Sequence, residues 1–318
     1  MPLDRHAARF LAMFGAAGQG QAYSGPQDRR RALEDLAKIA DDDRCAVASV
    51  DDITVPGGAG LLKARAYTPL GAEPSLMPGL VYFHGGGWVA GDLDTHDGVC
   101  RRLAAASGAK VIAIDYRRAP EHPFPAAIDD AWAAAVHIAV NARAFGIDPT
   151  RIGVAGDSAG AGLAAAVCQI ASSGGPWFAC QLLICPILDL AREAPSRLEY
   201  ADGYFLDRAS MEKDIAYYLG EGADVRDPRL SPLLAADLHG LPPAIIHTAE
   251  YDPFRDEGEA YAARLRDAGV TVRATRHDGM IHYFYAMPKT IPYAVKAAER
   301  TGAEVSDALA ALPVRRTA

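Results

Sequence analysis

The amino-acid sequence predicts an α/β fold, in which a mostly parallel central sheet is flanked by helices. Short apolar segments alternate with helical ones along most of the 318 residues. Most of the apolar segments lack the polar–apolar alternation of half-exposed strands, as is typical of strands buried on both faces. The helical segments end at glycine, which commonly terminates a helix.

The expected strands and helices follow one another along the chain. The segment 61–69 alternates between polar and apolar side chains, so we expect an outer strand there. Buried strands are expected at 79–85, 109–116, 151–157, 181–188 and 243–250. A last strand precedes a glycine-containing loop near residue 279. Helices are expected at 95–108, 126–146 and 256–269.

Two segments interrupt this alternation. Residues 1–45 look helical and precede every expected strand, and residues 190–225 form an aromatic, charged helical insert. Because the sequence shows no low-complexity linker, we expect both segments to fold onto one domain as a cap. The catalytic domain would then consist of residues 46–189 and 226–318.

Composition and charge argue against several classes of protein. The formal net charge of −8 does not suit binding to nucleic acid or to an anionic membrane, because both require a basic surface. No apolar run reaches the roughly 20 residues that span a bilayer, and the first 20 residues lack a signal-peptide pattern. The cysteines show no metal-ligand spacing, so we expect free thiols in a cytoplasmic protein: Cys45, Cys100, Cys168, Cys180 and Cys185.

The segment GDSAG at 156–160 places Ser158 between an expected strand and an alanine-rich expected helix. Glycines two residues before and after the serine suit a sharp turn in which larger side chains would clash. Such a turn raises the serine hydroxyl above the sheet, beside the free N–H groups at the start of the helix. We therefore expect Ser158 to be a nucleophile rather than a simple helix N-cap.

A serine hydroxyl needs a base to become a nucleophile, and an acid must hold that base. Folds with this turn place the acid and then the histidine after the serine. Asp252 is the expected acid because it comes just after the strand 243–250, at the edge where α/β sheets carry functional groups. His282, in a loop after the last strand, is the expected base. His277 at the strand end is the solvated alternative, and His247 is expected to be structural.

Three consecutive glycines, Gly85, Gly86 and Gly87, follow an expected strand within the segment HGGGW. Glycine is costly in conformational entropy, so one unusual turn would not require three of them. Backbone N–H groups without side chains can approach a developing oxyanion closely. We expect an oxyanion-binding loop here, and a flexible surface loop is the alternative.

Five motifs together resemble the hormone-sensitive lipase family of microbial carboxylesterases. They are HGGGW, DYRRAPEHPFPAAIDD, GDSAG, DPFRDEG and GMIHYF, in the order and spacing of that family, from about residue 60 to 290. The resemblance implies the α/β-hydrolase fold, with a helical cap built from an N-terminal segment and an insert before the acid. The chain departs from the usual family pattern at Ala161 and Gly162, which follow GDSAG, and at Arg118, where a leucine is common.

The resemblance also implies roles for individual residues. The nucleophile, acid and base would be Ser158, Asp252 and His282. The oxyanion hole would involve Gly85, Gly86, Gly87 and Ala159. Of these four, the last three would supply N–H donors, while Gly85 would shape the turn. His84 would support the glycine loop without reacting. Structural supports beneath the site would be Asp115, Tyr116, Arg117 and Glu121.

Aromatic side chains near these motifs predict the substrate pocket. Trp88 follows the oxyanion loop, and the insert carries Tyr200, Tyr204, Phe205, Tyr217 and Tyr218. The pocket is expected to involve Trp88, Asp157, Tyr204 and Phe205. The alternative is that the insert aromatics only attach the cap to the sheet.

The sequence therefore predicts a serine carboxylesterase that acts on small, water-soluble esters, with acyl chains of about two to eight carbons. No metal or organic cofactor is expected, and a homodimer is left open. Two other classes remain. One is an amide, carbamate or formamide hydrolase with the same triad. The other is a non-catalytic binding protein of this fold, as the gibberellin receptors are, although those lack the histidine that this chain has at His282.

Overall fold

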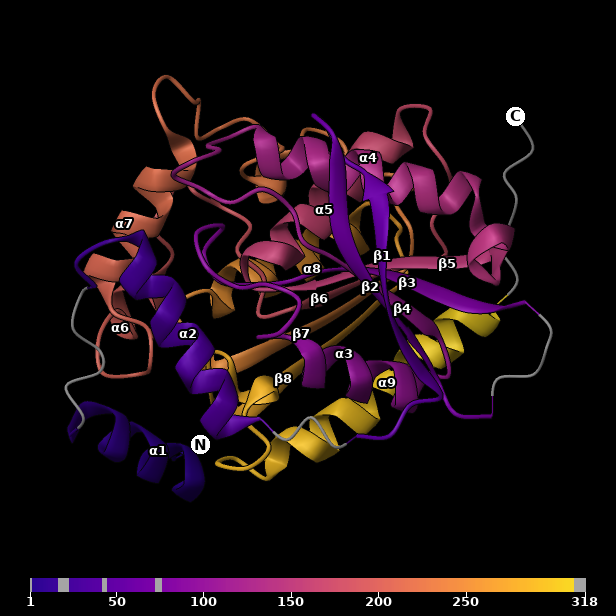
Figure 1. Cartoon of the computed structure of the whole chain (residues 1–318). Helices are drawn as coiled ribbons and strands as arrows, with labels where there is room; N and C mark the ends of the chain where they lie inside the picture. Colours follow the sequence, from indigo (N-terminus) through magenta and orange to yellow (C-terminus); the bar gives the residue numbers. More distant parts are fainter. Residues whose placement is uncertain (1, 17–22, 42–44, 72–75, 312–318) are drawn as a thin grey trace.

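The computed structural model describes residues 2–16, 23–41, 45–71 and 76–311. An eight-stranded sheet in the order β1-β2-β4-β3-β5-β6-β7-β8 crosses its centre (Figure 1). β2 pairs antiparallel with both β1 and β4, and the six strands from β4 to β8 are parallel. The strands are β1 (Ser49–Pro56), β2 (Leu61–Thr68), β3 (Met77–Phe83), β4 (Lys110–Ile114), β5 (Ile147–Asp157), β6 (Cys180–Ile184), β7 (Ala244–Tyr251) and β8 (Val272–Ile281). The predicted α/β fold is therefore confirmed.

Helices cover both faces of the sheet (Figure 1). One face packs against α4 (Ala126–Val140), α5 (Ala159–Ser172) and α8 (Arg255–Asp267). The other face packs against α3 (Asp97–Ser107) and α9 (Tyr293–Ala310). Both faces of the parallel strands are therefore buried, which explains why their sequences are continuous apolar runs.

Two strands differ from the sequence-based expectation. The prediction that 61–69 is an outer strand is wrong, because β1 pairs with β2 and occupies the edge of the sheet. β1 carries the exposed Asp51 and Asp52 in mid-strand, and these charges obscure its strand pattern. β8 continues through Gly279 to Ile281, so His277 lies inside a strand rather than at its end.

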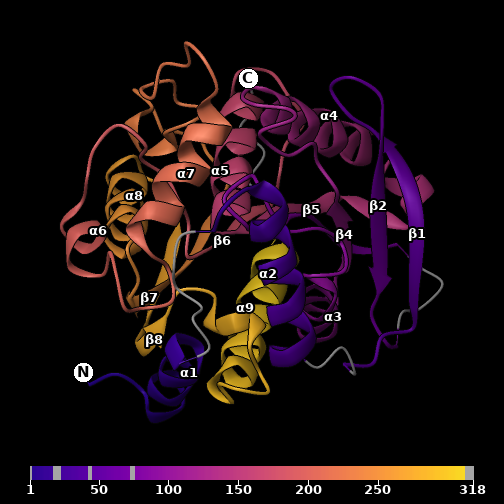
Figure 2. The same cartoon turned by 60° about the vertical axis from the view of Figure 1, so that its left-hand side comes forward.

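The two helical segments lie next to each other although they are far apart in the sequence. The first contains α1 (Arg5–Ala16) and α2 (Pro26–Ala40), and the second contains α6 (Pro195–Glu199) and α7 (Arg208–Leu219). Both views show α2 close to α7 (Figures 1 and 2). The Lys213 ammonium of α7 donates to the Tyr23 carbonyl, with Nζ 2.7 Å from the oxygen, and so joins the two segments directly.

The cysteines agree with the expectation of free thiols. All five cysteines are free, and all except Cys45 are buried. Burial raises the pKa of the Cys180 thiol to about 12, so this thiol is protonated at neutral pH. None of the helices in the described ranges combines the length and apolar character that crossing a membrane requires.

Candidate active site

Ser158 occupies the turn between β5 and α5. Its backbone is strained, with φ 52° and ψ −120°. A β carbon at Gly160 would collide with the carbonyl of Phe83, and one at Gly156 would collide with the carbonyl of Gly160. Both glycines are therefore required for the tight packing that holds the serine above the carboxyl end of β5.

Asp252 and His282 complete a hydrogen-bonded chain with Ser158. His282 Nε2 lies 3.0 Å from Ser158 Oγ, and His282 Nδ1 lies 2.8 Å from Asp252 Oδ2. Asp252 directly follows β7, is fully buried, and accepts the Phe254 N–H at 2.8 Å on its other oxygen. His282 directly follows β8, and the edge of its ring contacts Phe254. The structure thus brings together the three residues that the sequence singled out.

The alternative base, His277, lies elsewhere. Its ring is buried and not solvated, because α9 covers this part of the sheet. His277 Nε2 is 2.7 Å from His247 Nδ1, and His247 Nε2 is 2.8 Å from a carboxylate oxygen of Glu304 on α9. His277 Nδ1 contacts the Tyr293 hydroxyl at 3.0 Å. Both histidines belong to this structural chain and not to the site around Ser158.

The glycine loop supplies two unoccupied N–H groups beside Ser158. Gly86 and Gly87 have φ values of 117° and 64°, which favour glycine. Within the described part of the chain, neither of their N–H groups donates a hydrogen bond. Ala159 is the first residue of α5, where N–H groups lack intrahelical acceptors. The Gly85 N–H, by contrast, donates to Asp157 Oδ1 at 2.9 Å, so it is occupied and cannot serve as an oxyanion donor.

Asp157 was expected in the substrate pocket, and this expectation is wrong. The side chain is fully buried beneath Ser158, where it accepts hydrogen bonds from the hydroxyls of Tyr82 and Tyr285 at 2.5 and 2.6 Å. His96 Nε2 lies 3.4 Å from Oδ2. Burial alone would raise the pKa of Asp157, but the interactions with His96, Tyr285 and Tyr82 lower it to about 2. The carboxylate is therefore ionised and structural.

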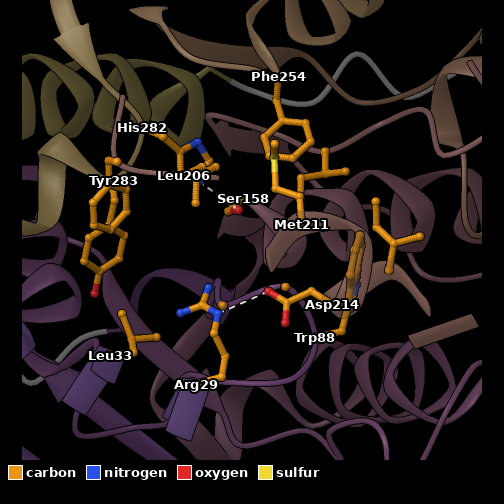
Figure 3. Close-up of a pocket in the computed structure, with 15 residues that line it drawn as sticks. Arg29, Leu33, Trp88, Ser158, Leu206, Met211, Asp214, Phe254, His282 and Tyr283 are labelled. Atoms are coloured by element: carbon orange, nitrogen blue, oxygen red, sulfur yellow. Dashed lines mark hydrogen bonds and ion pairs between the residues drawn. The ribbon is translucent and has the colours of Figure 1, made fainter. Parts of the chain in front are cut away.

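A cavity opens in front of Ser158 and His282 (Figure 3). As predicted, Trp88 and Phe205 line it, and Trp88 is stacked on Tyr218 with ring centroids 4.2 Å apart. Tyr204 does not line it, because its ring packs against Tyr200 and Tyr251 instead. The remaining apolar and aromatic lining residues are Leu33, Ile187, Leu206, Met211, Ile215, Phe254 and Tyr283.

Two charged residues of the cavity were missed by the sequence analysis. Arg29 of α2 and Asp214 of α7 both line it, and Arg29 Nε donates to Asp214 Oδ2 at 3.2 Å. The Tyr23 hydroxyl also donates to Asp214. Burial raises the pKa of Asp214, although Arg29 and Tyr23 act in the opposite direction. The two partners are 185 residues apart in the sequence, so no local pattern indicates the pair.

One group of side chains could approach a metal ion in the described part of the chain. Cys185 Sγ, a carboxylate oxygen of Asp252 and a ring nitrogen of His282 lie within 4.8 Å of one another. The Asp252 carboxylate and the His282 ring already share a hydrogen bond. The geometry therefore matches an acid–base pair better than a metal site.

The fold and this arrangement together define a class of protein. A carboxylate, an imidazole and a serine hydroxyl are hydrogen-bonded in series. Gly86 and Gly87, whose N–H groups donate no hydrogen bond within the described part of the chain, line the same cavity as the hydroxyl. This combination suits acyl transfer through a serine nucleophile. The class is that of the serine hydrolases with an α/β-hydrolase fold.

Comparison with known proteins specifies the family. A family described as having the alpha/beta hydrolase fold matches residues 80–286. The chain is 45% identical to the carboxylic ester hydrolase LipN of Mycobacterium tuberculosis over 242 residues, which are 74% of this chain and 64% of LipN. It is 44% identical to the carboxylesterase NlhH of the same species, over 78% of this chain and 79% of NlhH.

A solved structure agrees with these relatives. The ester hydrolase EH1AB1, from the metagenome of Lake Arreo, superposes with a TM-score of 0.92 at 43% identity, covering 96% of this chain and 98% of that one. The chain belongs to the hormone-sensitive lipase family of microbial carboxylesterases. The predicted family, and with it the class of carboxylic ester hydrolase, is confirmed.

The buried histidine chain generates a prediction about stability. Burial and the neighbouring His247 lower the pKa of His277 to about 3, against about 6.5 in an unfolded chain. Between these values the unfolded chain binds more protons, so the stabilisation is complete above pH 6.5 and is lost as the pH falls towards 3. The free energy of unfolding, measured with urea, should be lower at pH 5 than at pH 7.5 in the wild type. The variant His277→Gln should make this difference smaller by up to about 2 kcal/mol.

The matched control is His239→Gln, since His239 is exposed at the surface. This variant should keep the full pH dependence. The prediction would be contradicted if, on lowering the pH from 7.5 to 5, the unfolding free energy of His277→Gln decreased as much as that of the wild type.

Proposed function

We propose that the protein hydrolyses short- to medium-chain carboxylic esters through a covalent acyl-enzyme on Ser158. The observation that carries the proposal is the hydrogen-bonded series from Asp252 through His282 to Ser158. His282 accepts the hydroxyl proton as Ser158 attacks the ester carbonyl, and then donates it to the departing alcohol. Water, activated by the same histidine, releases the acid and restores the serine.

Asp252 sets the orientation and tautomer of His282. Its carboxylate can accept only an N–H at Nδ1, which leaves the lone pair of Nε2 directed at Ser158 Oγ. The same carboxylate stabilises the imidazolium that forms when the proton is transferred. The N–H groups of Gly86, Gly87 and Ala159 bind the oxyanion, and loss of one such donor typically costs about 2.7–4 kcal/mol of transition-state stabilisation.

The two helical segments, residues 1–45 and 190–225, act as a cap that defines the substrate pocket. They contribute Leu33, Phe205 and Met211 to the lining of the cavity in front of Ser158. Trp88 and Tyr218, stacked on each other, support one wall. An apolar cavity with such walls favours acyl chains of about two to eight carbons over long ones. The free cysteines support a cytoplasmic location.

The role of the acid can be tested by comparing two aspartates four residues apart. Asp252→Asn should lower kcat by about 10⁴, because the histidine would be held in the wrong tautomer. Asp256→Asn is the matched control, since Asp256 accepts the Ser196 N–H at 2.9 Å and anchors the insert. Steady-state kinetics on a nitrophenyl ester would measure both. A mild effect at Asp252 with a severe one at Asp256 would refute the assignment.

The pocket predicts the preferred chain length. In a series of nitrophenyl esters from acetate to palmitate, kcat/KM should rise by at most about fourfold per methylene until the cavity is full and then fall. The turnover should be greatest between acetate and octanoate and should not increase when the substrate forms an emulsion. Highest activity on palmitate, or a rate increase at an oil–water interface, would show a true lipase instead.

A further inference from the structure

Apart from Ser158, His282 and the glycine loop, most of the side chains that line the cavity are apolar or aromatic, and Arg29 and Asp214 introduce charge at one side. Figure 3 shows the Arg29 guanidinium beside Leu33, in the space between Tyr283 and Asp214. Its Nε donates to Asp214, and the guanidinium lies over the Tyr23 ring, 6.0 Å from the centroid. Among the described residues, its two terminal nitrogens have no hydrogen-bond partner, although they are the groups that recognise carbonyl and carboxylate oxygens.

Asp214 fixes the guanidinium in place. Its carboxylate packs directly against Gly87, where a β carbon would collide with Oδ2. A negative charge at this position would oppose the oxyanion that the Gly87 N–H is proposed to bind. Arg29 and the Tyr23 hydroxyl both donate to Asp214 and offset this charge. Because Nε is anchored, the terminal nitrogens are held towards the cavity without further loss of side-chain freedom.

Tyr283 adds a second unsatisfied polar group. Its hydroxyl is buried and, within the described part of the chain, has no hydrogen-bond partner. Its ring lies parallel to that of Phe205, with centroids 5.8 Å apart. Tyr283 is the next residue in the chain after His282. Figure 3 shows the hydroxyl end of Tyr283 turned to the same side of the cavity as Leu33 and Arg29. Buried polar groups are normally hydrogen-bonded, so the unpaired hydroxyl of this cavity-lining residue has the capacity to donate to a further acceptor.

We propose that Arg29 and Tyr283 form a polar subsite for a second oxygen acceptor, a ketone or a carboxylate, on the ester substrate. The rest of the substrate would lie against the apolar side chains of the cavity. The inference rests on the proposed ester hydrolysis and adds a substrate class to it: esters of keto acids, half-esters of dicarboxylic acids, or the corresponding esters of keto and carboxy alcohols. Plain alkyl esters leave the subsite unpaired, and such a mismatch discriminates strongly between substrates.

The test compares esters of nearly equal shape. The first series is ethyl 4-methylpentanoate, ethyl 4-oxopentanoate and monoethyl succinate, which differ only in the group at the end of the acyl chain. The second series carries the same groups on the alcohol: 3-methylbutyl acetate, 4-acetoxy-2-butanone and 3-acetoxypropanoate. In at least one series the wild type should prefer an oxygen-bearing ester, by about tenfold or more in kcat/KM. The series that shows the preference identifies the half of the ester that reaches the subsite.

Variants then assign the preference to the subsite. Arg29→Met should abolish it, and Tyr283→Phe should reduce it. Arg31→Met is the matched control, because Arg31 lies on the same helix but is exposed and pairs with Asp28. It should retain the wild-type preference. Asp214→Asn should shift the preference towards the carboxylate ester over the ketone, because it removes the charge that balances Arg29.

The double variant Arg29→Met with Asp214→Asn separates loss of the subsite from the effect of an unpaired Asp214. It should still lack the preference. Equal kcat/KM values for all three esters in both series of the wild type would overturn the inference, and so would a preference that survives in the double variant. If none of the six esters is hydrolysed by the wild type, the proposed function fails as well as the subsite. If the wild type hydrolyses the plain esters as well as the oxygen-bearing ones, the subsite is refuted and the proposed ester hydrolysis is not.

Discussion

The buried carboxylate of Asp157 is the point at which the segments of the active site are joined. It accepts hydrogen bonds from the Gly85 N–H of the glycine loop, the Tyr82 hydroxyl of β3 and the Tyr285 hydroxyl of the segment after His282. Its own backbone leads directly into Ser158. An ionised carboxylate can remain at this fully buried position because several hydrogen-bond donors converge on it. One charge thereby links the segments that carry Ser158, His282 and the glycine loop.

The second constraint comes from the cap. Residues 23–40 bring Arg29 to Asp214 of α7, and Asp214 in turn packs against Gly87 of the glycine loop. The N-terminal segment therefore contributes electrostatics as well as apolar surface. A charge pair in an apolar cavity is weak evidence for stability, because removing both groups from water is costly. Its position in the same cavity as Ser158 is the basis for the proposed role in substrate recognition.

The sequence predicted the fold and the three central residues because their signals are local. Apolar runs, the glycines around Ser158 and the position of Asp252 after a strand each follow from backbone geometry within a few residues. The edge strand β1 was missed because Asp51 and Asp52 mask its pattern. The pocket was predicted only in part, since Asp157 turns beneath the serine and Tyr204 packs on Tyr251. Contacts such as Arg29 to Asp214 depend on how distant segments pack, which no spacing in the sequence reveals.

The central claim is that Ser158 carries the acyl group, and covalent labelling tests it most directly. The enzyme would be treated with diethyl 4-nitrophenyl phosphate, which phosphorylates activated serines, and its intact mass and peptide map would be measured. The account predicts one diethylphosphoryl group per chain, located on Ser158, with activity lost in proportion to labelling. Full modification at another residue, or turnover that continues while Ser158 is blocked, would contradict it.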